Sequence, residues 1–436
     1  MNQNRIQNKS QSGFADNYLK KSVTGNRIIE GPPDKNLKYI AVIPAFNESG
    51  LIQSLDSLFK CESINESIEI LTVINCPYNC NKETLQFNTK LRDDAEKWSE
   101  SHNTAGKKFH FMFVKGEDKK NSGVGFARKT VMDEAIARFN LLDRPEGIIL
   151  SLDADVLVDR NYFKMIDEHF RLHPDTDGCS IYFEHPLEGG MENDVYKAIA
   201  QYELHLRYYV ESMRYSGHPN VFHTVGSAFA VKAGAYCKQG GMNKRQAGED
   251  FYFLQKVFDL GNFSECNSTK VIPSPRPSNR VPFGTGPVVL HFLNDKKEIK
   301  TNNPELFEIL KEFLLSVPLI YECTRKRDFI FINNYNPVLR EFLIRNDFEN
   351  KIIEIYENSS GPGAFRKRFL RWFNMFRSLK FLNHGKSVFP DIPVTLAAMA
   401  LLKKKGIRAK EKEEAKYYLN ILRDLEKNTT TPLSQQ

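Results

Sequence analysis

Cysteine is scarce in this chain and follows no paired pattern. The seven cysteines, at positions 61, 76, 80, 179, 237, 266 and 323, are odd in number and include no Cys-x-x-Cys pair. This distribution indicates neither a disulfide framework nor a zinc site, and it is typical of a protein in a reducing compartment.

Long apolar runs are absent as well. Residues 1–35 are rich in Asn, Gln, Ser and Lys and lack the apolar stretch of a secretory signal. No later run reaches the roughly 18 apolar residues that span a bilayer. We therefore expect a cytoplasmic protein with a polar, flexible leader over residues 1–35.

Excess charge of one sign is also small. The chain has 61 basic and 54 acidic residues, which gives a formal net charge of +7. This falls short of the signature of nucleic-acid-binding proteins, so we expect no nucleic-acid partner. It does suit an anionic ligand or a membrane surface.

What the chain does have is a regular alternation of strand and helix patterns. Strands are predicted at 37–43, 67–75, 109–114, 148–152, 177–184 and 224–231, and helices at 50–61, 82–99, 125–139, 194–213 and 247–260. From about residue 304 the pattern is helical and charged. The alternation predicts an α/β fold with a mostly parallel sheet flanked by helices, in which ligands bind at the carboxyl ends of the strands. We expect this domain over residues 36–295 and a helical C-terminal extension over 296–436.

Two acidic residues, Asp153 and Asp155, follow the apolar run 148–152. Read as a strand of period two, their spacing places both carboxylates on one face, where a hard divalent cation can join them. Unpaired acids at the end of a buried strand are otherwise costly. The alternative is that they are two solvated acids in a turn.

Four motifs occur in an order that resembles a known family. Pro44-Ala-Phe-Asn-Glu48 follows the first strand, Gly123-Val-Gly-Phe-Ala-Arg128 opens a helix, Asp153-Ala-Asp155 ends a strand, and Gly248-Glu-Asp250 opens another helix. Together they resemble the nucleotide-sugar glycosyltransferases of the GT-A fold, especially family 2, over about residues 37–292. The resemblance implies a Rossmann-like GT-A core.

The resemblance also implies that Pro44, Asn47 and Glu48 hold the nucleotide, with Glu48 near the base or ribose. Capping of the following helix by Asn47 and Glu48 is a compatible alternative. Many family members end the second strand in an Asp that reads the base, whereas this chain has Asn75 there. Its amide can still hydrogen-bond a base edge, so the identity of the base stays open.

Basic side chains are expected near the diphosphate. Arg128 either reaches a phosphate or forms an ion pair with Asp153. Residues 274–286 are rich in Pro and Gly. This stretch either closes over the diphosphate, with Arg276 or Arg280 as a clamp, or is an ordinary surface loop.

A divalent metal, Mn²⁺ or Mg²⁺, is a further implication. Asp155 would bind it, with Asp153 as the second acid of the site, in contact with the ribose or a metal-bound water. The cation would neutralise the diphosphate as the sugar bond breaks. His291, within what reads as a strand at 288–292, is a candidate further ligand, and a core histidine is the alternative.

Glu249 and Asp250 resemble the Glu-Asp pair that faces the acceptor in inverting family members. Asp250 would act as general base and take the proton from the attacking hydroxyl. The alternative is that both acids are present because the helix dipole favours negative charge at a helix N-terminus. Gly226 begins a stretch that resembles the family segment beneath the donor sugar.

Residues 365–381 interleave cations with aromatic residues at helical spacing. This segment could lie on the inner face of an anionic membrane, where a lipid-linked acceptor is found. The alternative, which we favour for an internal segment, is a helix that packs its aromatic side chains on the catalytic domain while its cations stay in water.

These features predict a metal-dependent glycosyltransferase that moves a hexose from a nucleotide diphosphate sugar to a hydroxyl of a saccharide or lipid-linked acceptor, with inversion. A sugar nucleotidyltransferase is the first alternative, but it normally needs a Gly-rich basic loop after the first strand, and residues 44–48 contain neither Gly nor Lys. The second alternative is a non-catalytic glycan- or nucleotide-binding protein of the same fold. The presence of Asp153, Asp155 and Asp250 disfavours it. No pattern in the sequence specifies the donor base or an oligomeric state.

Overall fold

A computed structural model describes residues 13–21, 28–118, 121–244, 248–280 and 284–428 of the chain. The chain forms two compact units. Unit 1 contains the described residues of 1–184 and 224–274, and unit 2 contains those of 185–223 and 275–430. The sequence prediction instead placed one boundary between residues 295 and 296. Each compact unit is made of separate stretches of the chain. The predicted domain boundary between residues 295 and 296 stays a prediction.

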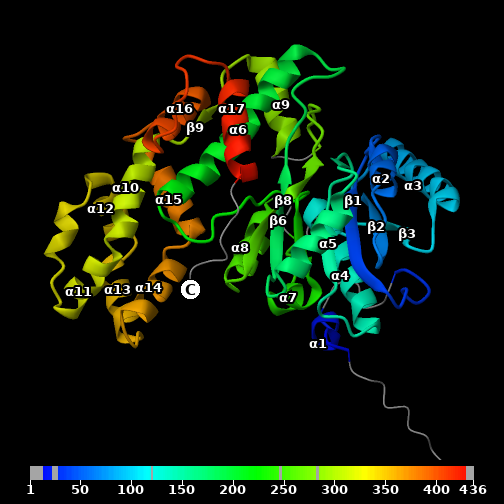
Figure 1. Cartoon of the computed structure of the whole chain (residues 1–436), viewed down its shortest axis with the longest axis horizontal. Coiled ribbons are helices and arrows are strands. Elements are labelled where there is room, and N and C mark those ends of the chain that lie inside the picture. The colour runs from blue at the N-terminus through cyan, green and yellow to red at the C-terminus, as the bar shows by residue number, and fades with distance from the viewer. Residues whose placement is uncertain (1–12, 22–27, 119–120, 245–247, 281–283, 429–436) are drawn as a thin grey trace, which may run out of the picture. The chain divides into compact units, whose positions relative to one another are not determined.

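Unit 1 is built on an eight-stranded sheet with the order β3-β2-β1-β4-β7-β6-β8-β5 (Figure 1). The strands are β1 (Leu37–Ala45), β2 (Ser67–Cys76), β3 (Lys107–Lys115), β4 (Ile148–Ser151), β5 (Leu157–Val158), β6 (Gly178–Phe183), β7 (Phe229–Lys232) and β8 (Phe263–Ile272). Parallel pairs join β1 to β2 and β4, β2 to β3, and β6 to β8. β7 runs antiparallel to β4 and β6, and β5 runs antiparallel to β8.

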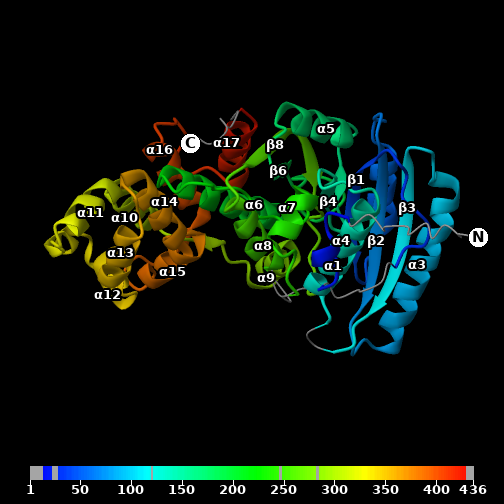
Figure 2. The ribbon, with the colours of Figure 1, turned by 90° about the horizontal axis from the view of Figure 1, so that it is seen from below.

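Unit 1 also contains helices, several of which pack on this sheet. They are α1 (Asp16–Leu19), α2 (Leu51–Phe59), α3 (Lys82–His102), α4 (Val124–Leu141), α5 (Tyr162–Leu172), α7 (Ala233–Lys238) and α8 (Glu249–Phe258). α4 packs on β1 and β2, α3 on β2 and β3, and α5 on β8 (Figure 2). Every residue of β2 is buried, as are all of β1 except Lys38, which is the continuous burial expected of parallel strands inside an α/β domain. The predicted α/β fold, with a mostly parallel sheet flanked by helices and a helical C-terminal region, is confirmed.

Part of the predicted flexible leader packs on α4. The backbone N–H of Ala15 donates to Asn140 over 2.7 Å, and the hydroxyl of Tyr18 donates to Asp133 over 2.6 Å. Further along, the N–H of Ile28 donates to Glu134 over 2.8 Å. These segments of the leader are therefore held against unit 1, while residues 1–12 and 22–27 lie outside the described part of the chain.

Unit 2 is helical, as predicted from about residue 304. Its helices are α6 (Asn193–Tyr215), α9 (Thr285–Asp295), α10 (Pro304–Leu315), α11 (Val317–Arg325), the 3₁₀ helix η1 (Ile330–Asn334), α12 (Pro337–Arg345), α13 (Phe348–Glu357), α14 (Pro362–Trp372), α15 (Met375–Gly385), α16 (Val394–Lys404) and α17 (Ala415–Asn428), and it also has two short strands, β9 (Lys300–Thr301) and β10 (Ile392–Pro393). Asn303 and Asn336 cap α10 and α12 through their side chains, and each precedes a proline at the first helical position, where no N–H is needed. Among the helices in the described ranges, none combines the length and apolarity needed to span a bilayer.

Buried charges join α6 to α17, which lie side by side in Figure 1. Glu203 of α6 is fully buried and accepts hydrogen bonds from Arg207 Nε over 3.0 Å and from Arg423 Nε over 2.8 Å. Arg423 donates a second bond to Glu203 over 2.8 Å, and Arg207 also pairs with Glu426. This network fixes the last described helix to α6.

Candidate functional site

The two aspartates lie in a turn. β4 ends at Ser151, so Asp153 and Asp155 follow it in irregular backbone, and the prediction that a strand aligns them on one face is wrong. The side chain of Asp153 is 41% exposed. The hydroxyl of Ser54, on α2, donates to the backbone carbonyl of Ala154 over 3.0 Å and ties this turn to the first turn of α2.

Arg128 connects the turn to α8. From α4, its Nη2 donates to Asp153 Oδ1 over 2.7 Å and its Nε donates to Glu249 Oε1 over 3.2 Å. Its Nη1 donates to Ser151 Oγ over 2.7 Å and to the carbonyl of Gly226 over 2.8 Å. The Arg128 side chain is 3% exposed. Three segments that are far apart in the sequence therefore meet around one guanidinium group.

These contacts decide between the two interpretations of Arg128. Its donors point to protein acceptors on the strand-end turn, the Gly226 loop and α8, so the ion pair with Asp153 is present and a phosphate contact is disfavoured. Burial alone would lower the pKa of Arg128, but the charges of Asp153, Glu249 and Asp250 raise that pKa above its usual value. The guanidinium group stays charged.

Asp250 lies in the first turn of α8, next to this cluster. The helix begins after Gly248, whose φ of 68° favours glycine. Asp250 Oδ1 accepts the N–H of Phe251 over 2.7 Å. Burial raises the pKa of Asp250 to about 6, and the neighbouring charge of Glu249 adds to this. Asp250 can thus exchange a proton near neutral pH, whereas an ordinary carboxyl stays ionised.

Gly226 permits the close approach of these groups. A Cβ atom at this position would lie 2.9 Å from Asp250 Oδ2 and 3.0 Å from Arg128 Nη2. No larger side chain fits without displacing one of the two. The glycine is therefore required by the packing of the charged groups around it.

The loop after β1 has a second set of polar contacts. Asn47 has a φ of 49°, and its N–H donates to Asn88 Oδ1 over 2.9 Å. The N-cap residue of α2 is Gly50, which has no side chain to cap the helix. Glu48 is 3% exposed, and its Oε1 accepts the N–H of Gly50 over 2.8 Å. Pro44, in contrast, is part of β1 and is paired with Val73 of β2.

Asn75 lies near the end of β2 and is 2% exposed. Its Nδ2 donates to the carbonyl of Gly123 over 3.4 Å, but its Oδ1 is buried and has no hydrogen-bond partner within the described residues. A buried acceptor without a donor is costly. An N–H from a ligand or an ordered water at this strand end would relieve that cost.

A disulfide follows directly. Cys76, the last residue of β2, is bonded to Cys80. The sequence pattern predicted no disulfide, because the cysteines are scattered and lack Cys-x-x-Cys spacing. The bond closes the short turn that begins next to Asn75, and the other five cysteines have free thiols.

Two positioning residues have no sequence signal. Asn88, on α3, is fully buried, and its Nδ2 donates to the carbonyl of Asn75 over 3.2 Å while its Oδ1 holds the N–H of Asn47. It joins the ends of β1 and β2. Ser151 donates to the carbonyl of Gly226 over 2.7 Å and also accepts from Arg128. Both lie outside any recognisable motif.

The remaining predicted site residues belong to unit 2. Arg280 Nε donates to Ser278 Oγ over 3.0 Å within the proline-rich stretch, and residues 281–283 of that stretch lie outside the described ranges. His291 is exposed on α9, so the predicted strand at 288–292 is wrong. An apolar run of this length fits a strand or a helix equally well, and here it continues a helix. The roles predicted for Arg276, Arg280 and His291 stay predictions.

The metal prediction can be compared with the acids present. The described ranges contain no group of three or more His, Cys, Asp and Glu side chains arranged to hold a metal ion. Asp153 and Asp155 supply two carboxylates from one turn, and one oxygen of Asp153 is taken by Arg128. Two carboxylates are too few to enclose a Mg²⁺ or Mn²⁺ ion. They fit an ion whose remaining ligands come from water or from phosphate groups.

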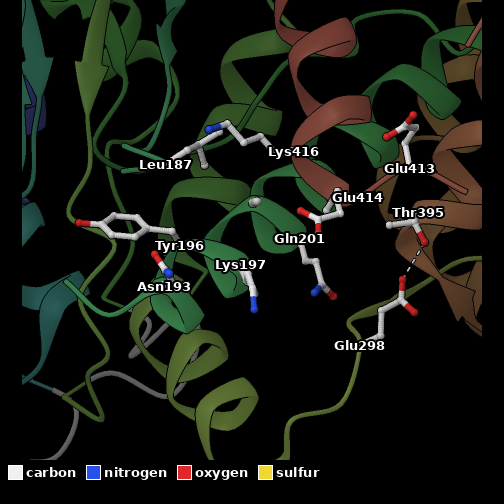
Figure 3. A pocket seen from close by; sticks show the side chains of 12 residues that line it. Leu187, Asn193, Tyr196, Lys197, Gln201, Glu298, Thr395, Glu413, Glu414 and Lys416 are labelled. Carbon is white, nitrogen blue, oxygen red and sulfur yellow. Dashed lines mark hydrogen bonds between the residues drawn. The ribbon is translucent and has the colours of Figure 1, made fainter. Parts of the chain in front are cut away.

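A separate pocket lies in unit 2 (Figure 3). It has a volume of about 510 Å³ and is lined by residues of α6, by Glu298 and Thr395, and by residues 413–416 at the start of α17. Thr395 donates to Glu298 over 2.7 Å. The lining mixes acids and lysines and includes none of the predicted site residues.

Comparison with known proteins gives resemblances of overall structure. No protein-family model and no curated protein sequence matches the chain. Among solved structures, residues 1–349 of Staphylococcus aureus TarS in complex with UDP-GlcNAc match with 13% identity and a TM-score of 0.39, covering 78% of this chain and 93% of that one. The mannosyltransferase PcManGT from Pyrobaculum calidifontis, in complex with GDP-Man and Mn²⁺, matches with 13% identity and a TM-score of 0.36, covering 95% of this chain and 92% of that one. A longer TarS structure matches with 15% identity and a TM-score of 0.35 over 52% of this chain, and this chain covers 35% of its length.

Proposed function

We propose that this protein is a glycosyltransferase that moves a hexose from a nucleotide diphosphate sugar to a hydroxyl group of a saccharide or lipid-linked acceptor, with inversion. One observation carries the proposal. Arg128 binds both Asp153 and Glu249, so the acidic turn after β4 and the first turn of α8 form one charged cluster. A transfer reaction needs a place for the leaving diphosphate beside a base for the acceptor, and this cluster supplies candidates for both.

Asp250 is the proposed general base. An efficient base has a pKa near the working pH, and burial brings the pKa of Asp250 to about 6. Its Oδ1 is oriented by the N–H of Phe251, and Oδ2 lies beside Gly226. Arg128 holds Glu249 next to Asp250, and the neighbouring charge adds to the raised pKa of Asp250, which makes Asp250 a better proton acceptor.

The nucleotide is proposed to bind at the ends of β1 and β2. Pro44, Asn47 and Glu48 would border it, and the unpartnered Oδ1 of Asn75 would accept an N–H from the base. Asn88 holds both strand ends in place. Arg280 is proposed to clamp the diphosphate and Arg276 to assist it.

Asp155 and Asp153 are proposed to hold Mg²⁺ or Mn²⁺, with His291 as a further ligand. When bound, the cation would offset the negative charge that develops on the leaving diphosphate. Arg128 binds one carboxylate oxygen of Asp153 and so fixes the orientation of that side chain.

Thermal shift with UDP-, GDP- and dTDP-sugars, with and without Mn²⁺, tests the proposal, because a ligand that binds the native state raises its melting temperature. We expect one base to stabilise the protein and Mn²⁺ to increase that shift. Asp155→Asn should lose the Mn²⁺-dependent part, whereas Asp175→Asn, an exposed acid outside the cluster, should keep it. Release of nucleoside diphosphate, with an inverted anomer by NMR, would support the transfer reaction. Pyrophosphate formation would instead indicate a nucleotidyltransferase, and the absence of any nucleotide binding would refute the proposal.

A further inference from the structure

α14 in unit 2 has one apolar face and one cationic face. Phe365, Phe369 and Trp372 are buried, and Phe369 and Trp372 pack against Phe313 and Phe348. These aromatic side chains therefore pack within unit 2, whereas the sequence prediction placed them on the catalytic domain. Arg366, Lys367, Arg368 and Arg371 are exposed on the same helix, and we call these four residues the α14 cations. The amphipathic pattern therefore serves packing on one side and leaves four positive charges in solvent on the other.

The α14 cations have no counter-charge. None of the four forms an ion pair or a hydrogen bond within the described residues. Between Glu357 and Asp391 the chain contains no acidic residue, so α14 and α15 carry cations alone. The exposed Lys380 of α15 adds to the same excess.

Cations on the neighbouring helices behave differently. Arg325 pairs with Glu322 over 2.6 Å, Arg327 with Glu357 over 2.7 Å, and Lys351 with Glu354 over 2.6 Å. Arg345 pairs with Glu341. α13 packs on α14, and its last turn contains Glu354 and Glu357. Both acids are thus already paired with other cations.

We propose that the α14 cations form a docking surface for the anionic headgroups of a lipid bilayer. Four unpaired cations on one helix complement a surface of negative charge. Such cations attract an anionic bilayer by electrostatics, without insertion of a helix. The proposal does not depend on the proposed transfer reaction.

A bilayer fits this part of the chain better than a nucleic acid does. A large apolar side chain is strongly exposed on a neighbouring helix: Leu319 is 53% exposed on α11, which packs on α14. Aliphatic side chains are stabilised in the headgroup region, whereas nucleic-acid surfaces offer them little. Proteins that bind single strands present aromatic rings for stacking, and the rings of α14 are buried.

Co-sedimentation of the full-length protein with vesicles tests the proposal. We expect binding to phosphatidylcholine vesicles that contain phosphatidylglycerol, no binding to pure phosphatidylcholine, and loss of binding as salt is raised. The variant R366Q/K367Q/R368Q/R371Q should weaken binding on the order of 600-fold, because each of the four cations contributes about fivefold near an anionic surface.

The matched control is R325Q/R327Q/R345Q/K351Q, which removes the same charge from paired cations and should retain most of the binding. Circular dichroism and melting temperature confirm that both variants fold. Equal losses in the two variants would show that net charge alone is sensed and would overturn the proposal. Failure of the native protein to bind anionic vesicles at low salt would also overturn the proposal. A competition experiment gives a further test: the proposal fails if an oligonucleotide displaces the protein from vesicles at a lower concentration than free lipid headgroups do.

Discussion

Nη2 of Arg128 lies 2.7 Å from Oδ1 of Asp153. The same side chain binds Glu249, so one buried cation balances acids from the strand-end turn and from α8. A buried ion pair that loses one partner leaves an uncompensated charge, so removal of the Arg128 guanidinium group should be costly.

Arg128→Met should destabilise the protein by about 3 kcal/mol or more, because Glu249 is left buried without its cation. Arg92→Met is the control, since Arg92 pairs with Asp93 over 2.6 Å on the surface, where such pairs contribute about 1 kcal/mol or less. Urea unfolding followed by circular dichroism measures both. A loss no larger than that of the control would contradict the role assigned to Arg128.

Asp250→Asn should reduce turnover by about 10²-fold or more, because an amide cannot accept the proton of the acceptor hydroxyl. In the native protein, kcat/KM should rise with pH through a midpoint near pH 6, as Asp250 loses its proton. Steady-state rates with the donor identified by thermal shift measure this profile. A flat profile between pH 5 and pH 7 would exclude Asp250 as the base, whatever the activity of the variant.

Asp250→Asn should increase stability although it lowers activity. The pKa of Asp250 is raised in the folded state, so its ionisation opposes folding: stability is highest where the group is protonated in both states and is lost as pH rises through about 6. Asp250→Asn should therefore be about 3 kcal/mol more stable than the native protein at pH 8 and no more stable at pH 3.5. Asp175→Asn should show no such dependence in parallel melts. Lost activity with gained stability separates a functional acid from a structural one.

The sequence predicts the elements of unit 1 better than their arrangement. Apolar runs and glycines locate β1, β2 and α8, because a parallel strand must be apolar on both faces and Gly248 adopts a positive φ. The meeting of Arg128 with Asp153 and Glu249 is not predictable locally, since it depends on β7 inserting beside β4 and bringing Gly226 to the end of that strand. Asn88 is hidden for the same reason: nothing in a polar helix marks which of its polar side chains faces inward.

Short segments mislead in a different way. Residues 288–292 form a mostly apolar run that shows neither helical nor strand periodicity. The flanking residues decide which structure forms, and here they continue the run as α9. The acids 153 and 155 follow a strand that ends sooner than its apolar run suggests. Cys76 and Cys80 are four apart, and only the turn between β2 and α3 brings them together.

Cys80→Ser should lower the free energy of unfolding by about 2 kcal/mol, the entropy expected for opening a very short loop. Cys323→Ser, which removes a free thiol on α11, is the control and should have a small effect. Alkylation of the denatured, unreduced protein followed by mass spectrometry should label five cysteines and leave Cys76 and Cys80 unlabelled. Labelling of all seven would show that the two thiols stay reduced.

Glu203→Gln should destabilise unit 2 by about 3 to 5 kcal/mol at pH 7, because Arg207 and Arg423 lose a shared buried carboxylate. Burial alone would raise the pKa of Glu203, but Arg207, His185 and Arg423 together hold that pKa well below its usual value. A lowered folded-state pKa contributes stability above the unfolded pKa near 4.5 and loses it as pH falls further, so the difference between variant and native protein should shrink below pH 4.5. Hydrogen exchange at α17 reports the effect where it originates, since Arg423 ties that helix to α6. Glu349→Gln, an exposed acid of α13, is the control, and a pH-independent difference for Glu203→Gln would mean that packing rather than charge holds α17.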